Sequence, residues 1–199
     1  MSTVKSKNLQ VGTDATASNN FTIYQPSTPD GTLRIGVGNA DSPTEVGRFD
    51  SNGYVATNVP AFAVGLSADQ SISSSTYTKC NLNTEDFDTT NNFDSSTNYR
   101  FQPTIAGYYQ INATMRFEGT NMINNTVAIY KNGSQARILG TNRVTVSSPV
   151  TISGGHVIYL NGTTDYIELY GYVSGTSLVF GVAGTVNNCH LSGSLIKAA

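Results

Sequence analysis

The sequence is poor in charge, in cysteine and in the residues that catalysis uses most often. Charged side chains make up 12% of the 199 residues, against about 25% in an average soluble domain. Two cysteines, Cys80 and Cys189, are too few for a disulfide framework, and we expect both thiols to be buried as small apolar groups. The two histidines, His156 and His190, lie in no catalytic motif. We therefore expect no enzyme, no cofactor and no metal site.

The balance of charge excludes two classes of partner. The 11 basic and 13 acidic side chains give a formal charge of −2, so no basic stripe is available for phosphates or anionic lipid. The N-terminal residues 1–7 lack the apolar core of a signal peptide, and no later apolar run has the length of a membrane span. We expect neither nucleic acid nor membrane as a partner, and synthesis in a cytoplasm.

What the sequence does contain is typical of β-structure. Val, Ile, Thr, Tyr and Phe are separated by turn-forming residues, among them 19 glycines. The clearest strand runs from Tyr109 to Phe117, where apolar and polar residues alternate five times. Asn-Gly pairs at 132–133 and 161–162 follow apolar runs and predict hairpins. Further strands are predicted at 61–66, 136–139, 144–152, 166–172, 178–182 and 191–196.

Residues 1–57 differ from the rest of the chain. A polar opening without a clear pattern is followed by two β runs, 32–37 and 45–49, which predict one small hairpin. An isolated hairpin is marginal in water, so this segment needs another surface to become ordered. We interpret it as an attachment arm or stalk, and residues 58–199 as a separate head. The candidate attachment residues are Leu33, Ile35, Val37, Phe49 and Tyr54.

An acidic cluster lies within residues 81–99. Glu85, Asp86, Asp88 and Asp94 could offer oxygen ligands to calcium. Their spacing lacks the Asp-x-Asp-x-Asp-Gly order of a known calcium loop, so a solvated loop is the preferred interpretation.

Five motifs, in order, connect the head to a known family. The second motif is Phe-x-Pro-x-x-x-Gly-x-Tyr at 101–109, and the third is Ala-Ile-Tyr-Lys-Asn-Gly at 128–133. The remaining motifs are at 60–66, 160–169 and 191–196. With these motifs, residues 60–198 resemble the globular head of complement C1q and the wider tumour-necrosis-factor-like superfamily. The second motif resembles the entry to a central strand of that family, and the third resembles one of its hairpins.

The resemblance implies an all-β fold: a ten-stranded antiparallel jelly-roll sandwich of two sheets, assembled as a homotrimer. Threefold contacts are head-to-tail, so each subunit needs two complementary patches. Outward-facing tyrosines are good interface anchors, and we expect Tyr108, Tyr166, Tyr170 and Tyr172 at the interface. The alternative is that these side chains cap the sandwich or meet solvent singly.

The N-terminal segment resembles the stalk segments that precede heads of this kind in bacteriophage fibre and capsid-decoration proteins, especially at 31–37 and 48–53. The calcium pattern and collagen-like stalk of the secreted animal proteins are absent. We therefore expect a virion structural protein, a trimeric decoration (cement) protein bound through its arm to the major capsid protein or another virion protein. The alternative is a tail-fibre or fibre-tip protein that binds the host cell surface.

Overall fold

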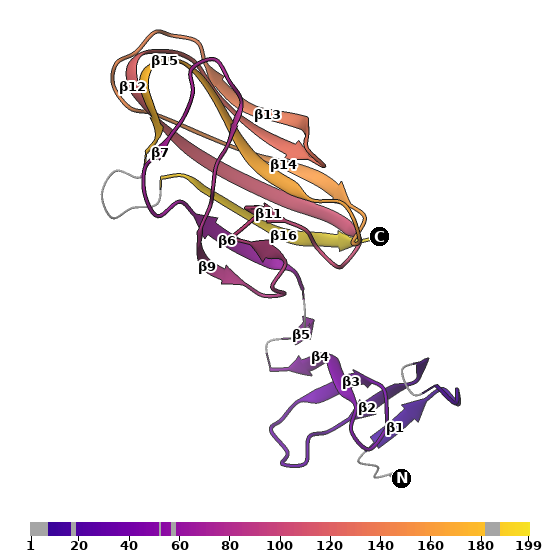
Figure 1. The fold of residues 1–199 in the computed structure, drawn as a ribbon. Coiled ribbons are helices and arrows are strands. Elements are labelled where there is room, and N and C mark those ends of the chain that lie inside the picture. Colours follow the sequence, from indigo (N-terminus) through magenta and orange to yellow (C-terminus); the bar gives the residue numbers. More distant parts are fainter. Residues whose placement is uncertain (1–7, 17–18, 52, 57–58, 182–187) are drawn as a thin grey trace. The chain divides into compact units, whose positions relative to one another are not determined.

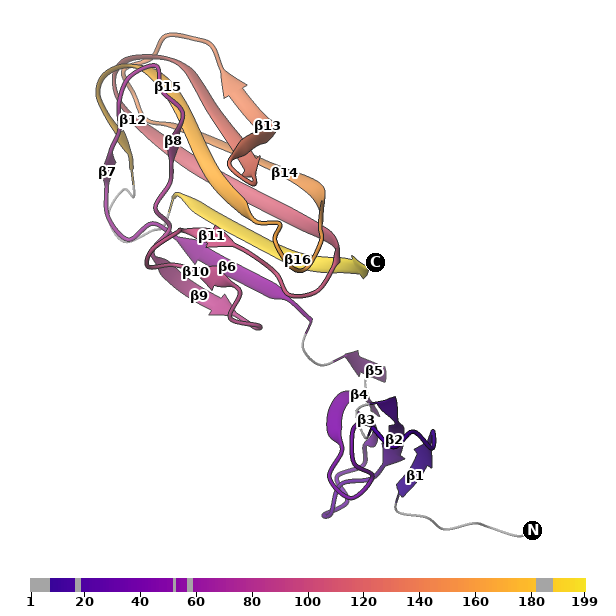
Figure 2. The same ribbon diagram turned by 45° about the vertical axis from the view of Figure 1, so that its right-hand side comes forward.

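The computed structural model describes residues 8–16, 19–51, 53–56, 59–181 and 188–199, with the side chains of Tyr54 and Ala56 left out. Throughout these ranges the regular elements are strands. The chain divides into two compact units, Met1–Val59 and Pro60–Ala199 (Figures 1 and 2).

The N-terminal unit contains one antiparallel sheet in which each strand pairs with the next along the chain (Figure 1). Its strands are β1 (Asn8–Val11), β2 (Phe21–Tyr24), β3 (Leu33–Val37), β4 (Thr44–Asp50) and β5 (Gly53–Ala56). The predicted hairpin is present as β3 and β4. The prediction of a single hairpin was nevertheless wrong, because β1, β2 and β5 extend it to five strands.

The head consists of eleven strands over the described residues. They are β6 (Ala61–Gly65), β7 (Gln70–Ser71), β8 (Thr78–Lys79), β9 (Thr84–Asp88), β10 (Phe93–Asp94), β11 (Arg100–Phe101), β12 (Gly107–Lys131), β13 (Ser134–Asn142), β14 (Val150–Leu160), β15 (Ile167–Phe180) and β16 (His190–Ala198). Their pairing is antiparallel throughout.

Strand β12 belongs to two sheet layers. Its first half lies between β14 and β16, and β16 continues to β6 and β9. Its second half lies between β13 and β15. The other edge of β15 pairs with β7, β8 and β11. This is a jelly-roll sandwich of two antiparallel layers, as expected. The number of strands does not match the expected ten exactly, because several strands are short and β12 takes part in both layers.

The bend in β12 lies between its two halves. The register against β15 shifts three times between Glu118 and Thr126. Asn121 and Asn124 have φ of 53° and 58°, a left-handed conformation that asparagine tolerates better than most residues. These irregularities turn the strand from one layer into the other.

The core lies between the layers, and aromatic side chains from both make its contacts. Phe62 of β6 stacks on Phe101 of β11 at 4.1 Å between ring centroids. Phe117 of β12 meets Phe180 of β15 edge to face at 5.7 Å. The predicted alternation from Tyr109 to Phe117 is confirmed, because its five apolar side chains are at most 2% exposed.

The two Asn-Gly pairs form different turns. Asn132 and Gly133, with φ of 53° and 76°, connect β12 to β13 as the predicted two-residue hairpin. The hairpin predicted at Asn161-Gly162 was wrong, since β14 and β15 pair with different halves of β12 and not with each other. The Asn161 side chain there accepts the backbone N–H groups of residues 163, 164 and 165 and turns the chain between layers.

Two strand boundaries also differ from the prediction. The strand predicted at 144–152 begins only at Val150, and Val146 forms an isolated bridge with Met122. The two strands predicted at 166–172 and 178–182 are one strand, β15, whose described part ends at Phe180. Residue 182 lies outside the described residues.

Gly162 provides a test of the crossover turn. Both Gly162 and Gly133 have positive φ, so alanine at either costs about 1–2 kcal/mol of backbone strain. At Gly162 an added Cβ would lie 2.4 Å from the Ala106 amide nitrogen, whereas at Gly133 the nearest atom is 3.6 Å away. We expect Gly162→Ala to lower head stability by an additional 1–3 kcal/mol or so compared with the control Gly133→Ala, as measured by urea unfolding. Equal losses would contradict this account of the turn.

Candidate assembly surfaces and a polar pocket

The N-terminal sheet has one apolar face. Side chains that are direct antiparallel partners point to the same side of a sheet, and the registers join Leu9 to Ile23, Ile23 to Ile35, and Leu33 to Phe49. Its eight apolar members, termed the apolar face from here on, are Leu9, Val11, Phe21, Ile23, Leu33, Ile35, Val37 and Phe49. Thr44, the register partner of Val37, also lies on this side. Leu9 is 59% exposed and Phe21 49%.

The opposite face of the same sheet is polar and covered. Thr22 on this side is fully buried, although Phe21 and Ile23 beside it are exposed on the other. Pro43 and the ring of Tyr24 lie directly over Gly36. The Glu45 carboxylate bridges two guanidinium groups, with Arg34 Nη1 at 3.0 Å and Arg48 Nη1 at 3.1 Å. Within the described residues of this unit, the chain therefore covers the polar side of the sheet, while six of the eight side chains on the apolar side are exposed.

The structure brings four of the predicted attachment residues onto the apolar face: Leu33, Ile35, Val37 and Phe49. Tyr54 is the register partner of Phe49, and its side chain lies outside the described part of the structure. The sequence analysis missed the other half of the face, Leu9, Val11, Phe21 and Ile23. Their alternation with polar neighbours in two four-residue strands was the available signal.

The head exposes a second surface with apolar and aromatic side chains on the β12–β14 layer. Tyr108 and Tyr159 are direct partners, with ring centroids 5.5 Å apart, and both are more than 40% exposed. Val157, one pair further along, is 40% exposed. The outward positions beyond it hold Asn112, Thr114 and Ser153. This face offers flat aromatic and hydroxyl-bearing groups, with Lys197 as the register partner of Tyr108 and Lys131 Nζ 5.8 Å from the centroid of the Tyr159 ring.

The other tyrosines predicted at the trimer interface lie on the opposite layer. Tyr170 stacks on Tyr130 at 3.9 Å, and Tyr77 contacts both Tyr130 and Tyr172. Tyr166, just before β15, lies under the guanidinium group of Arg100 at 4.3 Å. The four candidates thus divide between two faces of the head, with Tyr108 alone on the first.

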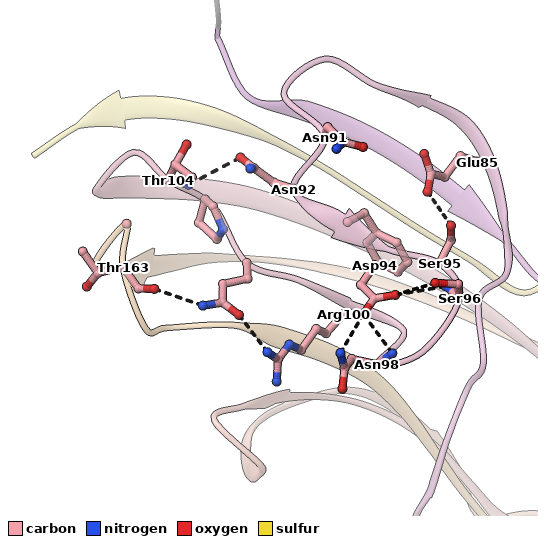
Figure 3. A pocket seen from close by; sticks show the side chains of 14 residues that line it. Glu85, Asn91, Asn92, Asp94, Ser95, Ser96, Asn98, Arg100, Thr104 and Thr163 are labelled. Atoms are coloured by element: carbon pink, nitrogen blue, oxygen red, sulfur yellow. Dashed lines mark hydrogen bonds between the residues drawn. The ribbon is translucent and has the colours of Figure 1, made fainter.

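A polar pocket of about 540 Å³ opens among the loops of the head (Figure 3). It is formed by the segments around β10 and β11 and by the turn after β14. Arg100 donates to Gln102 Oε1 at 2.9 Å, and Gln102 donates in turn to the Thr163 carbonyl at 3.0 Å. The other labelled side chains in Figure 3 are Glu85, Asn91, Asn92, Asp94, Ser95, Ser96, Asn98 and Thr104.

The carboxylates of this region are used by the loop itself. The segment 81–99, predicted as a loop, contains β9 and β10. Asp88 accepts the backbone N–H groups of Asn92 and Phe93, both at 2.6 Å. Asp94 accepts those of residues 96, 97 and 98, and these bonds hold its pKa well below the usual range. Within the described ranges no group of three His, Cys, Asp or Glu side chains could hold a metal ion.

The two cysteines are free and buried in the head core. Burial raises the pKa of the Cys80 thiol well above its usual value. Cys189 accepts the Arg116 amide at 3.3 Å through its sulfur. Both thiols therefore act as packed core groups.

In the part of the chain that the structure describes, no helix is long and apolar enough to cross a membrane.

Comparison with known proteins gives structural likeness only. No protein-family model and no curated protein sequence matches the chain. Similar solved structures include murine APRIL (12% identity, TM-score 0.48, 70% of this chain and 100% of that chain) and Eiger TNF from S. frugiperda (7%, 0.46, 71% and 93%). The PRD1 vertex protein P5 matches at 14% identity and TM-score 0.47, over 87% of this chain and 86% of that one. Likeness at this level carries no conclusion about function.

Asp94 makes the wall of the pocket sensitive to acid. The pKa of Asp94 is lower in the folded chain than its ordinary value of 3.8. The ionised carboxylate therefore stabilises the loop fully above pH 3.8, and this stabilisation is lost as the pH falls through the lower pKa of the folded chain. We expect Asp94→Asn to speed hydrogen exchange at residues 96–98 near neutral pH. The matched control is Asp86→Asn, in the same acidic cluster. Unchanged exchange in the first variant would show that the carboxylate does not hold the loop.

Proposed function

We propose that this protein is a structural component of a bacteriophage particle and works as a homotrimer. The observation that carries the proposal is that, among the described residues, each unit exposes apolar and aromatic side chains side by side on one sheet face. Exposed apolar faces of this kind mark protein interfaces. The resemblance of residues 31–37 and 48–53 to phage stalk segments supports the location in a virion.

The head supplies the two patches that a closed threefold contact requires. One is the Tyr108, Tyr159 and Val157 surface on the β12–β14 layer. The other is the row of tyrosines on the β15 layer, with Tyr170 and Tyr172 at its centre, and Tyr166 beside it. Their placement on different faces suits a head-to-tail contact better than a twofold one.

For its place on the particle, we favour decoration of the capsid. The N-terminal unit contributes no side chain to the described core of the head, so it is the part that we assign to attachment, with the major capsid protein or another virion protein as partner. A protein that binds only the assembled shell stabilises that shell by mass action, by about 2.7 kcal/mol at a hundredfold excess over the Kd.

A fibre-tip role is the second candidate, and the polar pocket is the observation that favours it. Amide, hydroxyl and guanidinium groups converge on this opening from several loops of the rigid head. Such groups suit a polyhydroxylated ligand such as a cell-surface glycan. In this role the head would contact the host and the N-terminal unit would face the virion.

Binding to capsids and to host cells separates the two roles. Purified full-length protein is incubated with capsids that lack it and with host cells, and the bound fraction is counted. The variant Thr163→Arg fills the pocket without removing a side-chain hydrogen bond of residue 163. A decoration protein binds capsids, and Thr163→Arg binds them equally well. Binding to cells that Thr163→Arg abolishes would instead establish the fibre-tip role, and binding to neither would contradict the proposal.

The trimer contact has its own test. Val157→Glu places a charge in the centre of the uncovered β14 surface, where desolvation of a carboxylate is costly. We expect sedimentation of this variant to show monomers at micromolar concentration, while the wild type and the control Thr176→Glu, at an exposed residue, sediment as trimers. A monomeric wild type would overturn the homotrimer.

A further inference from the structure

We propose that the apolar face of the N-terminal sheet packs against the same face of two other copies of this chain, so that three sheets enclose one shared core. The inference rests on the proposed homotrimer and names the partner of the N-terminal unit.

The composition of the face decides what can cover it. All eight side chains of the apolar face are hydrocarbon or phenyl groups. Arg34, Glu45 and Arg48 of this sheet pair with one another on the other side. A covering surface therefore has to be apolar, because a polar one would lose its water without gaining hydrogen bonds. A second copy of the same face satisfies this condition.

The sheet also lacks a second layer of its own. In a stable β-domain the apolar face of a sheet is packed against another sheet or a helix. The described residues of this unit form one sheet, and the segment around Pro43 lies over its polar side. The missing layer has to come from outside the unit.

The size of the face favours a tethered partner over a free one. The five strands are each about 4.8 Å from the next, and all but the seven-residue β4 are four to five residues long, so they form a face of about 400 Å². Two such faces bury about 800 Å², which is the size of a crystal contact and below the roughly 1,200 Å² of a stable complex between separate proteins. A foreign protein would gain little from this face alone.

The other copies in a trimer are tethered. Residues 57–60 alone connect β5 to β6, and such a segment reaches about 18 Å at most. Three heads held together by their own contact would keep three sheets at an effective concentration in the millimolar range. At that concentration a small apolar contact suffices.

Threefold packing follows from the odd number of copies. If two sheets packed face to face as a pair, the third copy would keep its apolar face in water. Three sheets that turn this face to a common axis each meet two neighbours and leave none uncovered. Leu33, Ile35, Val37 and Phe49 would then hold the stalk together, and attachment to the shell would fall to other surfaces of the unit, among them the charged face with Arg34 and Arg48.

Cross-linking of the full-length protein tests the inference. Ile35→Cys places a thiol at the centre of the apolar face, and Gln10→Cys places one on the polar face, where Gln10 is exposed. Both are treated with a bismaleimide that spans about 10 Å, the distance between packed sheets. The native thiols are buried, so the wild type serves as the blank. We expect covalent dimers from Ile35→Cys at a yield independent of protein concentration, and none from Gln10→Cys.

The outcomes separate this inference from the proposed function. Trimers by sedimentation without Ile35→Cys dimers would overturn the shared core and leave the homotrimer intact. Monomers by sedimentation would overturn both. Ile35→Cys thiols that form no dimers and lose their reactivity towards maleimide only after capsids are added would assign the apolar face to the shell and contradict the inference. Val37→Cys, on the same face, repeats the measurement if Ile35→Cys does not fold.

Discussion

Strand β12 is the element on which the head depends, because it is central in both layers of the sandwich. Its first half is bonded on both sides, by β14 and β16, and its second half by β13 and β15. Any movement of one layer against the other would therefore have to bend a strand that is paired along both edges. The bulges between Glu118 and Thr126 fix where that bend lies. They also fix which residues of one strand face outward on each layer, Tyr108 on the first and Tyr130 on the second.

The N-terminal unit is stabilised in a different way. In the head, each layer is the cover of the other, and Phe62 and Phe101 meet between them. The N-terminal sheet has its ion pairs and its covering loop on one side and bare apolar side chains on the other. Completion of its core is thus an event of assembly under our inference, whereas the core of the head is complete within one chain.

The parts of the fold that the sequence predicted are those with a strong local signal. Tyr109–Phe117 alternates five times between apolar and polar residues, and Asn132-Gly133 joins two strands that pair directly, so local pattern and final pairing agree. Asn161-Gly162 has the same two residues but connects strands that pair with different halves of β12. Which half of β12 each strand pairs with depends on contacts between residues that are distant in sequence, so a local pattern cannot predict it.

The candidate surfaces could be predicted from the sequence to about the same extent as the fold. Leu33, Ile35, Val37 and Phe49 share a face because one hairpin aligns them. Leu9, Val11, Phe21 and Ile23 join it through two strands of four residues each, too short for alternation to stand out from a polar background. Tyr166, Tyr170 and Tyr172 were correctly separated from the core side chains of β15, but only the arrangement of the layers shows that Tyr108 lies on the opposite face of the head.

The separation of the two cores has an evolutionary consequence. Every side chain of the described head core lies between Phe62 and Leu191, so a genetic crossover near codons 57–60 would exchange one whole unit without cutting through a packed interior. Recombination there could join this head to a different stalk, or this stalk to a different head, in a single event. Under the proposed function, a shared junction of this kind would allow the attachment and display functions of the particle to diversify independently.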